Sequence, residues 1–313
     1  HHTNSSMTPE QVYNLGLSEV TRVQGELRQA LQAQGIDAPT LVAGMQQVVQ
    51  ASGVYHTDTQ AGRQQVLDAF RAIIDRSSSA VAPYFDLKPK AQLQIRGVNA
   101  GAGGYYVQPA LDGSRPGVFY ANLSQQVYPK YAMPTLAYHE AVPGHHFQLA
   151  AQIELTSLPL FQRAAIFAFP TAFVEGWALY AEELAGEIGL YKDDPYGNIG
   201  RLKAELFRAS RLVVDTGIHL KRWTREQAIA YMDEANGTQG GAYTGEVDRY
   251  IAWPGQALAY KTGELKILAL REQAKSALGS KFEIKSFHDV VLGNGTVPLP
   301  TLELAVNLFI AGK

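Results

Sequence analysis

The feature that most constrains the fold of this chain is a helix-like string that contains a proline and a glycine, HEAVPGHH at residues 139–146. Pro143 has no N–H to donate, and in a continuous helix its ring would clash with the carbonyl of His139, four residues earlier. Val142 is also displaced from helical angles because it precedes a proline. The sequence therefore predicts a helix that bulges or restarts near Gly144.

The same string matches a zinc-binding pattern with two residues inserted. In a His-Glu-x-x-His helix, two histidines one turn apart bind zinc, and the glutamate between them activates a water. Without Pro143 and Gly144, the string would be His-Glu-Ala-Val-His. In a straight helix, His139 and His145 would lie about 9 Å apart along the axis, so the irregular segment has to bring them together. We prefer His145 as the second ligand, and His146 remains the alternative.

A third ligand is predicted in FVEGWALYAEE at residues 173–183, where apolar residues recur at helical intervals between Pro170 and Gly186. Glu175 lies inside this apolar run, where an unpaired carboxylate is costly. A metal ion, or a histidine bound to one, would remove that cost. Glu182, two turns later, lies on the same face and has two interpretations: it orients a metal ligand, or it is an ordinary solvated charge.

The strings HEAVPGHHFQ and FVEGWALYAEEL resemble the domain-of-unknown-function 885 family. These are bacterial proteins regarded as zinc metallopeptidases and similar to the gluzincins, in which two histidines and a downstream glutamate bind zinc. The resemblance extends from about Thr8 to the C-terminus. Three further strings carry it: RASRLVVDTGIH, EVDRYIAWPGQALAYKTGELKI and FHDVVLGNGTVPLPTLE.

The resemblance implies specific roles for four residues. His139, His145 and Glu175 would bind zinc, and Glu140 would act as general base. Members of the family are usually much longer, so the resemblance also implies that the N-terminal half of the full-length protein is absent from this chain.

Hydrolysis through a tetrahedral intermediate needs a donor to the oxyanion. The candidates are Tyr260 and His219, with Arg249-Tyr250 ranked behind them, because Tyr260 and His219 are polar groups in apolar helical sequence. Each has a structural alternative. Tyr260 could be a core aromatic residue with a satisfied hydroxyl, and His219 could be bonded to Asp215.

Arg211 and Asp215 lie four residues apart on a predicted helix. This spacing is typical of an ion pair on one helix face. The sequence assigns them no other role.

Two β-rich runs, at 101–107 and 117–122, flank the turn Asp112-Gly113 and predict a hairpin. In metallopeptidases of this design an edge strand pairs with an extended substrate, as in β-augmentation. The alternative is a simple surface hairpin.

Bulk composition excludes several classes of function. The chain has 313 residues, a net charge of −2 and no cysteine. Nothing in this charge distribution indicates nucleic-acid binding, and no apolar run reaches the roughly 20 residues that span a bilayer. Without cysteine, only histidines and carboxylates remain as metal ligands. The absence of cysteine fits an exported protein, whether periplasmic, lipid-anchored or secreted, but does not exclude the cytoplasm. The oligomeric state is not predicted.

The predicted fold is mainly α, a gluzincin-like helical metallopeptidase domain with a small antiparallel sheet or hairpin beside the active-site helix. Residues 1–6 are interpreted as the remnant of an expression tag, and 7–313 as one catalytic domain. Its four parts are a helical N-terminal part, a hairpin region, the metal-site helices and a C-terminal helical part: 7–90, 91–130, 131–190 and 191–313. Helices are expected at 8–34, 61–82, 198–220, 224–234 and 255–278.

Three functions are compatible with this sequence. The leading one is a zinc peptidase that hydrolyses peptide bonds, with a peptide or small amide as substrate. The second is a zinc hydrolase of a non-peptide amide or ester. The third is a catalytically silent binding or scaffold domain, which predicts no metal and no dependence on Glu140.

Overall fold

Helices account for most of the computed structural model, which describes residues 2–99, 103–164 and 170–312. The mainly α fold class is therefore confirmed. The helices are α1 Pro9–Ala33, α2 Leu41–Ser52, α3 Gln60–Val81, α4 Met133–Glu140, α5 His145–Glu154, α6 Leu160–Arg163, α7 Thr171–Glu187, α8 Pro195–His219, α9 Arg225–Asn236, α10 Thr244–Ala252, α11 Ala259–Leu278, α12 Ile284–Gly293 and α13 Leu299–Ala311. Short 3-10 turns occupy Ala82–Tyr84, Lys130–Ala132 and Gly279–Lys281.

Local sequence signals set most of the helix boundaries. Thr8 and Thr224 each begin a helix with a capping box, in which the threonine side chain and a glutamine three residues later satisfy each other's backbone N–H groups. Asp194 caps α8, and Pro195 occupies its first turn. These helices were expected at 8–34, 224–234 and 198–220, and the structure confirms them to within a few residues.

The expected helix at 255–278 begins four residues late, at Ala259. Gly255 adopts a positive φ of 79°, which a right-handed helix does not accommodate. Its N–H is bonded instead to the carboxylate of Asp215, at 3.1 and 3.0 Å. A tertiary contact therefore holds this segment in turns.

The predicted hairpin is present as β3 Gly104–Val107 paired antiparallel with β4 Gly117–Asn122. Its first residues, 101 and 102, lie outside the described residues. An unexpected strand, β2 Leu93–Val98, pairs with β4 in parallel, so the sheet is mixed, with the order β2-β4-β3. A second, two-stranded sheet joins β1 Val54–His56 to β5 Val127–Pro129. In both sheets the strands are short, and β3 is an edge strand.

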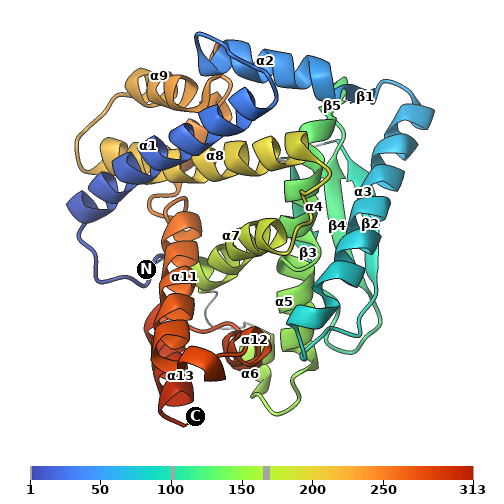
Figure 1. Cartoon of the computed structure of the whole chain (residues 1–313), viewed down its shortest axis with the longest axis vertical. Coiled ribbons are helices and arrows are strands. Elements are labelled where there is room, and N and C mark those ends of the chain that lie inside the picture. The colour runs from blue at the N-terminus through green and yellow to red at the C-terminus, as the bar shows by residue number, and fades with distance from the viewer. Residues whose placement is uncertain (1, 100–102, 165–169, 313) are drawn as a thin grey trace.

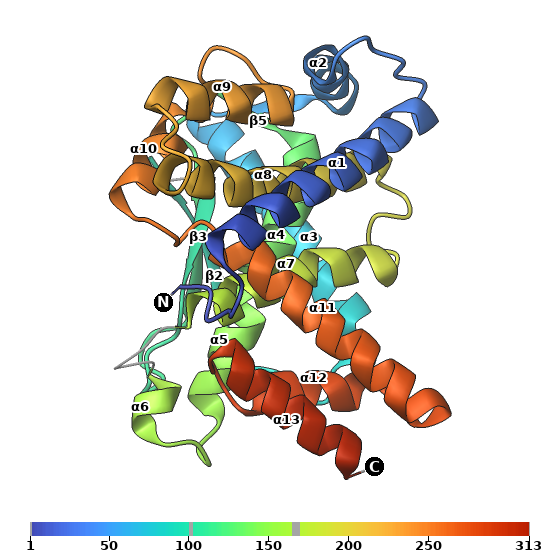
Figure 2. The same cartoon turned by 90° about the vertical axis from the view of Figure 1, so that its left-hand side faces the viewer.

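The centre of the molecule is built around α7. Figure 1 shows α11 on one side of α7 and α4 and α5 on the other, with the mixed sheet and α3 beyond them. In Figure 2, α1 crosses in front of α8, and α9 lies above α8. The main apolar cluster includes the fully buried Trp177 of α7; the ring of Phe85 lies against Trp177, and the ring of Phe147 lies against Phe85.

Two glycines allow α7 and α11 to touch through their backbones. A Cβ on Gly176 would lie 2.4 Å from the carbonyl carbon of Gly263, and a Cβ on Gly263 would lie 1.8 Å from the carbonyl oxygen of Ala172. No side chain larger than hydrogen fits either position without displacing a helix. The contact sets the separation between Glu175 on α7 and Tyr260 on α11.

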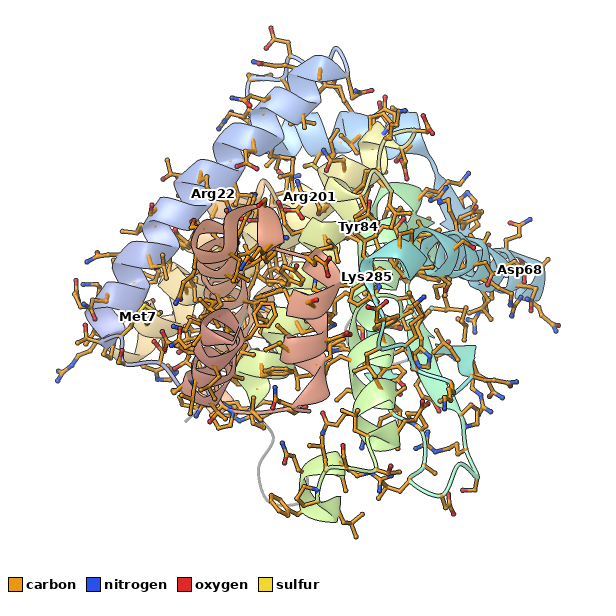
Figure 3. The ribbon with its side chains drawn as sticks, turned by 60° about the horizontal axis from the view of Figure 1, so that its bottom comes forward. Met7, Arg22, Asp68, Tyr84, Arg201 and Lys285 are labelled. Carbon is orange, nitrogen blue, oxygen red and sulfur yellow. The ribbon has the colours of Figure 1, made fainter. Side chains whose placement is uncertain are left out.

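An ion network that is buried at Lys261, Glu205 and Glu264 joins α1 and α8 to α11. Arg22 and Arg201, both labelled in Figure 3, each pair with Glu205 of α8. Lys261 of α11 approaches the same carboxylate at 2.7 Å and Glu264 at 2.6 Å. Removing one member of such a network leaves an uncompensated buried charge, so these helices are held as a unit.

None of the helices in the described part of the chain is long and apolar enough to cross a membrane.

Candidate metal site

The helix break predicted at the proline separates α4, which ends at Glu140, from α5, which begins at His145. Trp177 donates its indole N–H to the carbonyl of Pro143 at 2.8 Å, and Ser77 donates to the carbonyl of Val142. The carbonyls released by the break are thus satisfied by side chains from α7 and α3. The irregular segment is anchored on both sides.

Gly144 is required at the turn between the two helices. A Cβ there would lie 1.9 Å from the carbonyl oxygen of His139 and 2.3 Å from that of Tyr138. Because glycine permits this approach, the chain reverses tightly enough for α5 to begin beside the end of α4.

The break brings His139 and His145 together with Glu175 of α7. One ligand atom from each lies within 4.8 Å of the others. The Oε2 atom of Glu175 lies 3.5 Å from Nε2 of His139 and 3.3 Å from Nε2 of His145. Two ligand atoms bound to one tetrahedral zinc at 2.0–2.1 Å are about 3.3–3.4 Å apart. The two distances from Glu175 therefore match the spacing of ligand atoms that share one zinc ion.

Glu175 also has an unmet need that a metal ion would fill. Its Oε2 atom is buried and has no hydrogen-bond partner among the described residues. Burial would raise the pKa of this carboxyl group, but His145 and His139 lower it overall, so the group is ionised. A buried, ionised oxygen that faces two imidazoles fits a cation.

His146 is not part of this cluster; His145 is the histidine that lies with His139 and Glu175. Nδ1 of His146 lies 2.9 Å from the hydroxyl of Tyr106 on β3. Burial lowers the pKa of His146 to about 4, so its ring is neutral. This histidine connects α5 to the edge strand.

Glu182 orients His139 and is not a solvated charge. It is only 4% exposed, and its Oε1 atom lies 2.7 Å from Nδ1 of His139. Thr135 donates to its other oxygen, and Arg208 of α8 lies 3.7 Å from Oε1. Burial would raise the pKa of Glu182, but Arg208 and His139 lower it overall. The carboxylate thus fixes the tautomer that leaves Nε2 of His139 free to bind a metal.

Replacing Glu182 with glutamine is expected to weaken the binding of a divalent ion by about 10- to 100-fold, because a neutral amide oxygen is a weaker acceptor for Nδ1–H of His139 than the carboxylate is. Competition against a chelator of known affinity measures this change. Glu183→Gln is the matched control, since Glu183 pairs with Arg201 instead of His139. Equal affinities for the two variants would contradict the orienting role.

Glu140 ends α4 directly beside the cluster. It is 6% exposed, and burial raises the pKa of its carboxyl group. His139 and His145 oppose that increase, and Glu175 adds to it. A carboxylate with a raised pKa next to metal ligands suits a group that accepts and returns a proton.

Of the predicted oxyanion donors, Tyr260 lies nearest the cluster. Its ring is nearly parallel to that of His139, with centroids 6.5 Å apart and an interplanar angle of 14°. Burial raises the pKa of its hydroxyl, and the charge of Glu175 raises it further. The hydroxyl therefore stays protonated and able to donate.

The structure does not bring His219 to the cluster. This residue is exposed at the end of α8, and its Nε2 lies 3.0 Å from the carbonyl oxygen of Tyr250. Arg249 is occupied by Glu246 and Gln256. The geometry favours Tyr260 over both.

Arg208 and Arg211 of α8 were not predicted from the sequence to be site residues. Arg211 pairs with Glu246 at 3.0 Å and not with Asp215, so the predicted ion pair is wrong. Its guanidinium lies 4.5 Å from the ring centroid of Tyr260. The available signal was two arginines three residues apart within an apolar helix, which is compatible with many structural roles.

The chain matches a known family of bacterial proteins. A family model described as "Bacterial protein of unknown function (DUF885)" matches residues 1–306. No curated protein matches the chain.

Two solved structures share the fold. One, from Colwellia psychrerythraea and described as a "putative lipoprotein", has 45% identity and a TM-score of 0.94 over 99% of this chain and 54% of its own. The other, from Shewanella oneidensis and described as a "putative lipoprotein of unknown function", has 23% identity and a TM-score of 0.78 over 96% of this chain and 56% of its own. The chain thus spans about half the length of the solved structures that it matches.

Proposed function

This chain belongs to the DUF885 family of bacterial proteins, and we propose from the geometry of its site that it is a zinc-dependent peptidase. The observation that carries the proposal is the convergence of His139, His145 and Glu175 next to a buried Glu140. The resemblance to gluzincins, based on the same four residues, supports it.

Zinc is the ion that this set of ligands favours. Two imidazoles and one carboxylate are typical of catalytic zinc sites, whereas magnesium and calcium prefer oxygen ligands. When bound, zinc would polarise a substrate carbonyl and lower the pKa of a water toward about 7.

The protein's own side chains would then divide the remaining work. Glu140 accepts a proton from the attacking water and later delivers it to the leaving amine. Tyr260 donates its hydroxyl to the oxygen on which negative charge develops. Glu182 keeps the ring of His139 in place.

The substrate would bind as an extended chain along β3. This strand is at the edge of its sheet and lies against α4 and α5, the two helices that carry the histidines. An edge strand offers unpaired backbone groups to a peptide. Tyr106 of β3 is tied to His146, so the strand is fixed relative to the site.

We also propose that the protein acts outside the cytoplasm. The support is the Colwellia relative, 45% identical and described as a "putative lipoprotein", together with the absence of cysteine from this chain.

The proposed function is tested by metal content and turnover. Protein purified without a nickel column and freed of its N-terminal histidines is expected to hold about one zinc per chain by elemental analysis. It is then expected to cleave members of a mixed peptide library, detected by mass spectrometry, and to lose this activity after chelation. If the zinc-loaded protein cleaves a non-peptide amide or ester but no peptide, the protein is a non-peptide hydrolase and the peptidase proposal is wrong. If the protein binds no zinc, the interpretation as a catalytically silent binding domain is favoured.

A further inference from the structure

Two arginines of α8 face the candidate metal site from the same side of their helix. Arg208 lies 3.7 Å from Glu182, the partner of His139. Arg211, three residues later, places its guanidinium over the ring of Tyr260. Residues three apart are neighbours on a helix surface. These two arginines therefore lie next to Glu182, which orients His139, and next to Tyr260, the proposed oxyanion donor.

Arg211 is buried with part of its hydrogen-bonding capacity unused. The residue is 5% exposed. Its Nε donates to the hydroxyl of Tyr250, and its Nη2 donates to Glu246, each at 3.0 Å. Its Nη1 atom has no partner within the described residues, and neither has Nε of Arg208. A buried donor without an acceptor is costly, and more so when it is charged.

The carboxylate that faces Arg211 is shared. Oε2 of Glu246 also accepts from Nη2 of Arg249 at 2.8 Å and from the hydroxyl of Tyr250 at 2.9 Å. One carboxylate oxygen thus serves two guanidinium groups and a phenol. The cluster has more positive charge and more donors than Glu246 can satisfy.

Aromatic contacts hold the guanidinium groups in position. The ring centroid of Phe207 lies 4.1 Å from the Cζ atom of Arg211 and 5.7 Å from that of Arg208. Such contacts favour a fixed guanidinium orientation. Arg211 is therefore preorganised before any ligand arrives.

We propose that Arg211, with Arg208 beside it, binds a carboxylate of the substrate, so that the preferred substrates are short peptides with a carboxylate close to the bond that is cleaved. This inference rests on the proposed peptidase function. A planar guanidinium binds carboxylates with strong, directional hydrogen bonds. The ring centroid of Tyr260 lies 6.5 Å from that of His139 and 4.5 Å from the guanidinium of Arg211, and an extended peptide spans about 3.3–3.6 Å per residue. The carboxylate therefore lies within a few residues of the reacting carbonyl.

Two sources supply such a carboxylate: the C-terminal α-carboxylate of the peptide, or an aspartate or glutamate side chain. A peptide with a free C-terminus is compared with the same peptide as its C-terminal amide, and each is made with alanine or glutamate next to the cleaved bond. For the unmutated protein, the expected result is a value of kcat/KM about 10- to 100-fold higher for the peptide that carries the recognised carboxylate. A difference between the free acid and the amide identifies the C-terminal α-carboxylate as the recognised group. A difference between glutamate and alanine identifies an acidic side chain.

The variants Arg211→Met and Arg211→Lys test whether the preference for a carboxylate-bearing peptide depends on the side chain of Arg211. Arg211→Met is expected to remove it and Arg211→Lys to retain part of it, with the loss appearing mainly in KM. Arg225→Met is the matched control, because Arg225 is exposed on α9 and pairs with Asp248. Direct binding of the acid and amide peptides to Glu140→Gln protein, measured by calorimetry, is expected to show the same difference without turnover.

The outcomes separate the two proposals. Equal cleavage of all four peptides by the unmutated protein, together with equal binding of them by the Glu140→Gln protein, would overturn the carboxylate site and leave the peptidase function intact. A preference that survives Arg211→Met would overturn the assignment to Arg211. Zinc-loaded protein that neither binds nor cleaves any of the peptides would overturn both.

Discussion

Replacing Glu140 with glutamine is expected to lower kcat by about 10²- to 10⁴-fold while the metal content stays at that of the unmutated protein. Glutamine preserves the shape of the buried side chain but cannot accept a proton from the attacking water. Glu140 is adjacent to His139 but is not in the ligand cluster, so metal binding should persist. Steady-state turnover of a cleaved library peptide and elemental analysis of the same sample measure both effects.

Retention of metal in that sample is the internal control, because it separates loss of the base from loss of the site. Peptidase activity equal to that of the unmutated protein would show that Glu140 is not the general base. If Glu140→Gln lost its metal as well as its activity, Glu140 would be needed to hold the metal ligands in place. The loss of activity would then give no evidence for a role in proton transfer.

Replacing Glu175 with alanine is expected to weaken metal binding by about 100-fold or more, and His145→Ala should do the same, because each removes one of three ligands from a site that depends on all of them. In Glu175→Ala the two imidazoles also lose the carboxylate that lies 3.5 and 3.3 Å from their Nε2 atoms. Chelator competition measures the affinities, and activity should fall in parallel.

His146→Ala is the matched control for this experiment. His146 adjoins His145 in the sequence, is similarly buried and faces Tyr106 instead of the cluster. It should therefore retain metal. A His146→Ala protein without metal, or a His145→Ala protein that binds metal as tightly as its parent, would reverse the ligand assignment.

Two features of the site follow from local sequence: the helix break and the position of Glu175 inside an apolar helix. Proline cannot continue a helix, so the break before His145 is a local property of the chain. A glutamate in an apolar helical run requires a partner, which drew attention to Glu175. Both inferences depend on the chemistry of one or a few adjacent residues.

Other features depend on residues distant in the sequence. The parallel pairing of β2 with β4 leaves no local pattern that distinguishes it from a loop followed by a hairpin. The turns at 255–258 are held by Asp215, and Arg211 finds its partner in Glu246 rather than four residues along its own helix. Whether Glu182 is solvated or orients His139 was likewise decided by how α7 packs against α4. In each case, residue spacing along the sequence is compatible with more than one partner or conformation, and the tertiary fold determines which one forms.

The backbone contact between α7 and α11 has a consequence for motion. Gly176 and Gly263 have no side chains between the two backbones that could change rotamer as the helices move. The helices α7 and α11 can therefore separate or slide only by breaking their backbone contact. Glu175 and Tyr260 therefore move as one rigid body. An opening that admits a substrate or releases a product is therefore not expected between α7 and α11.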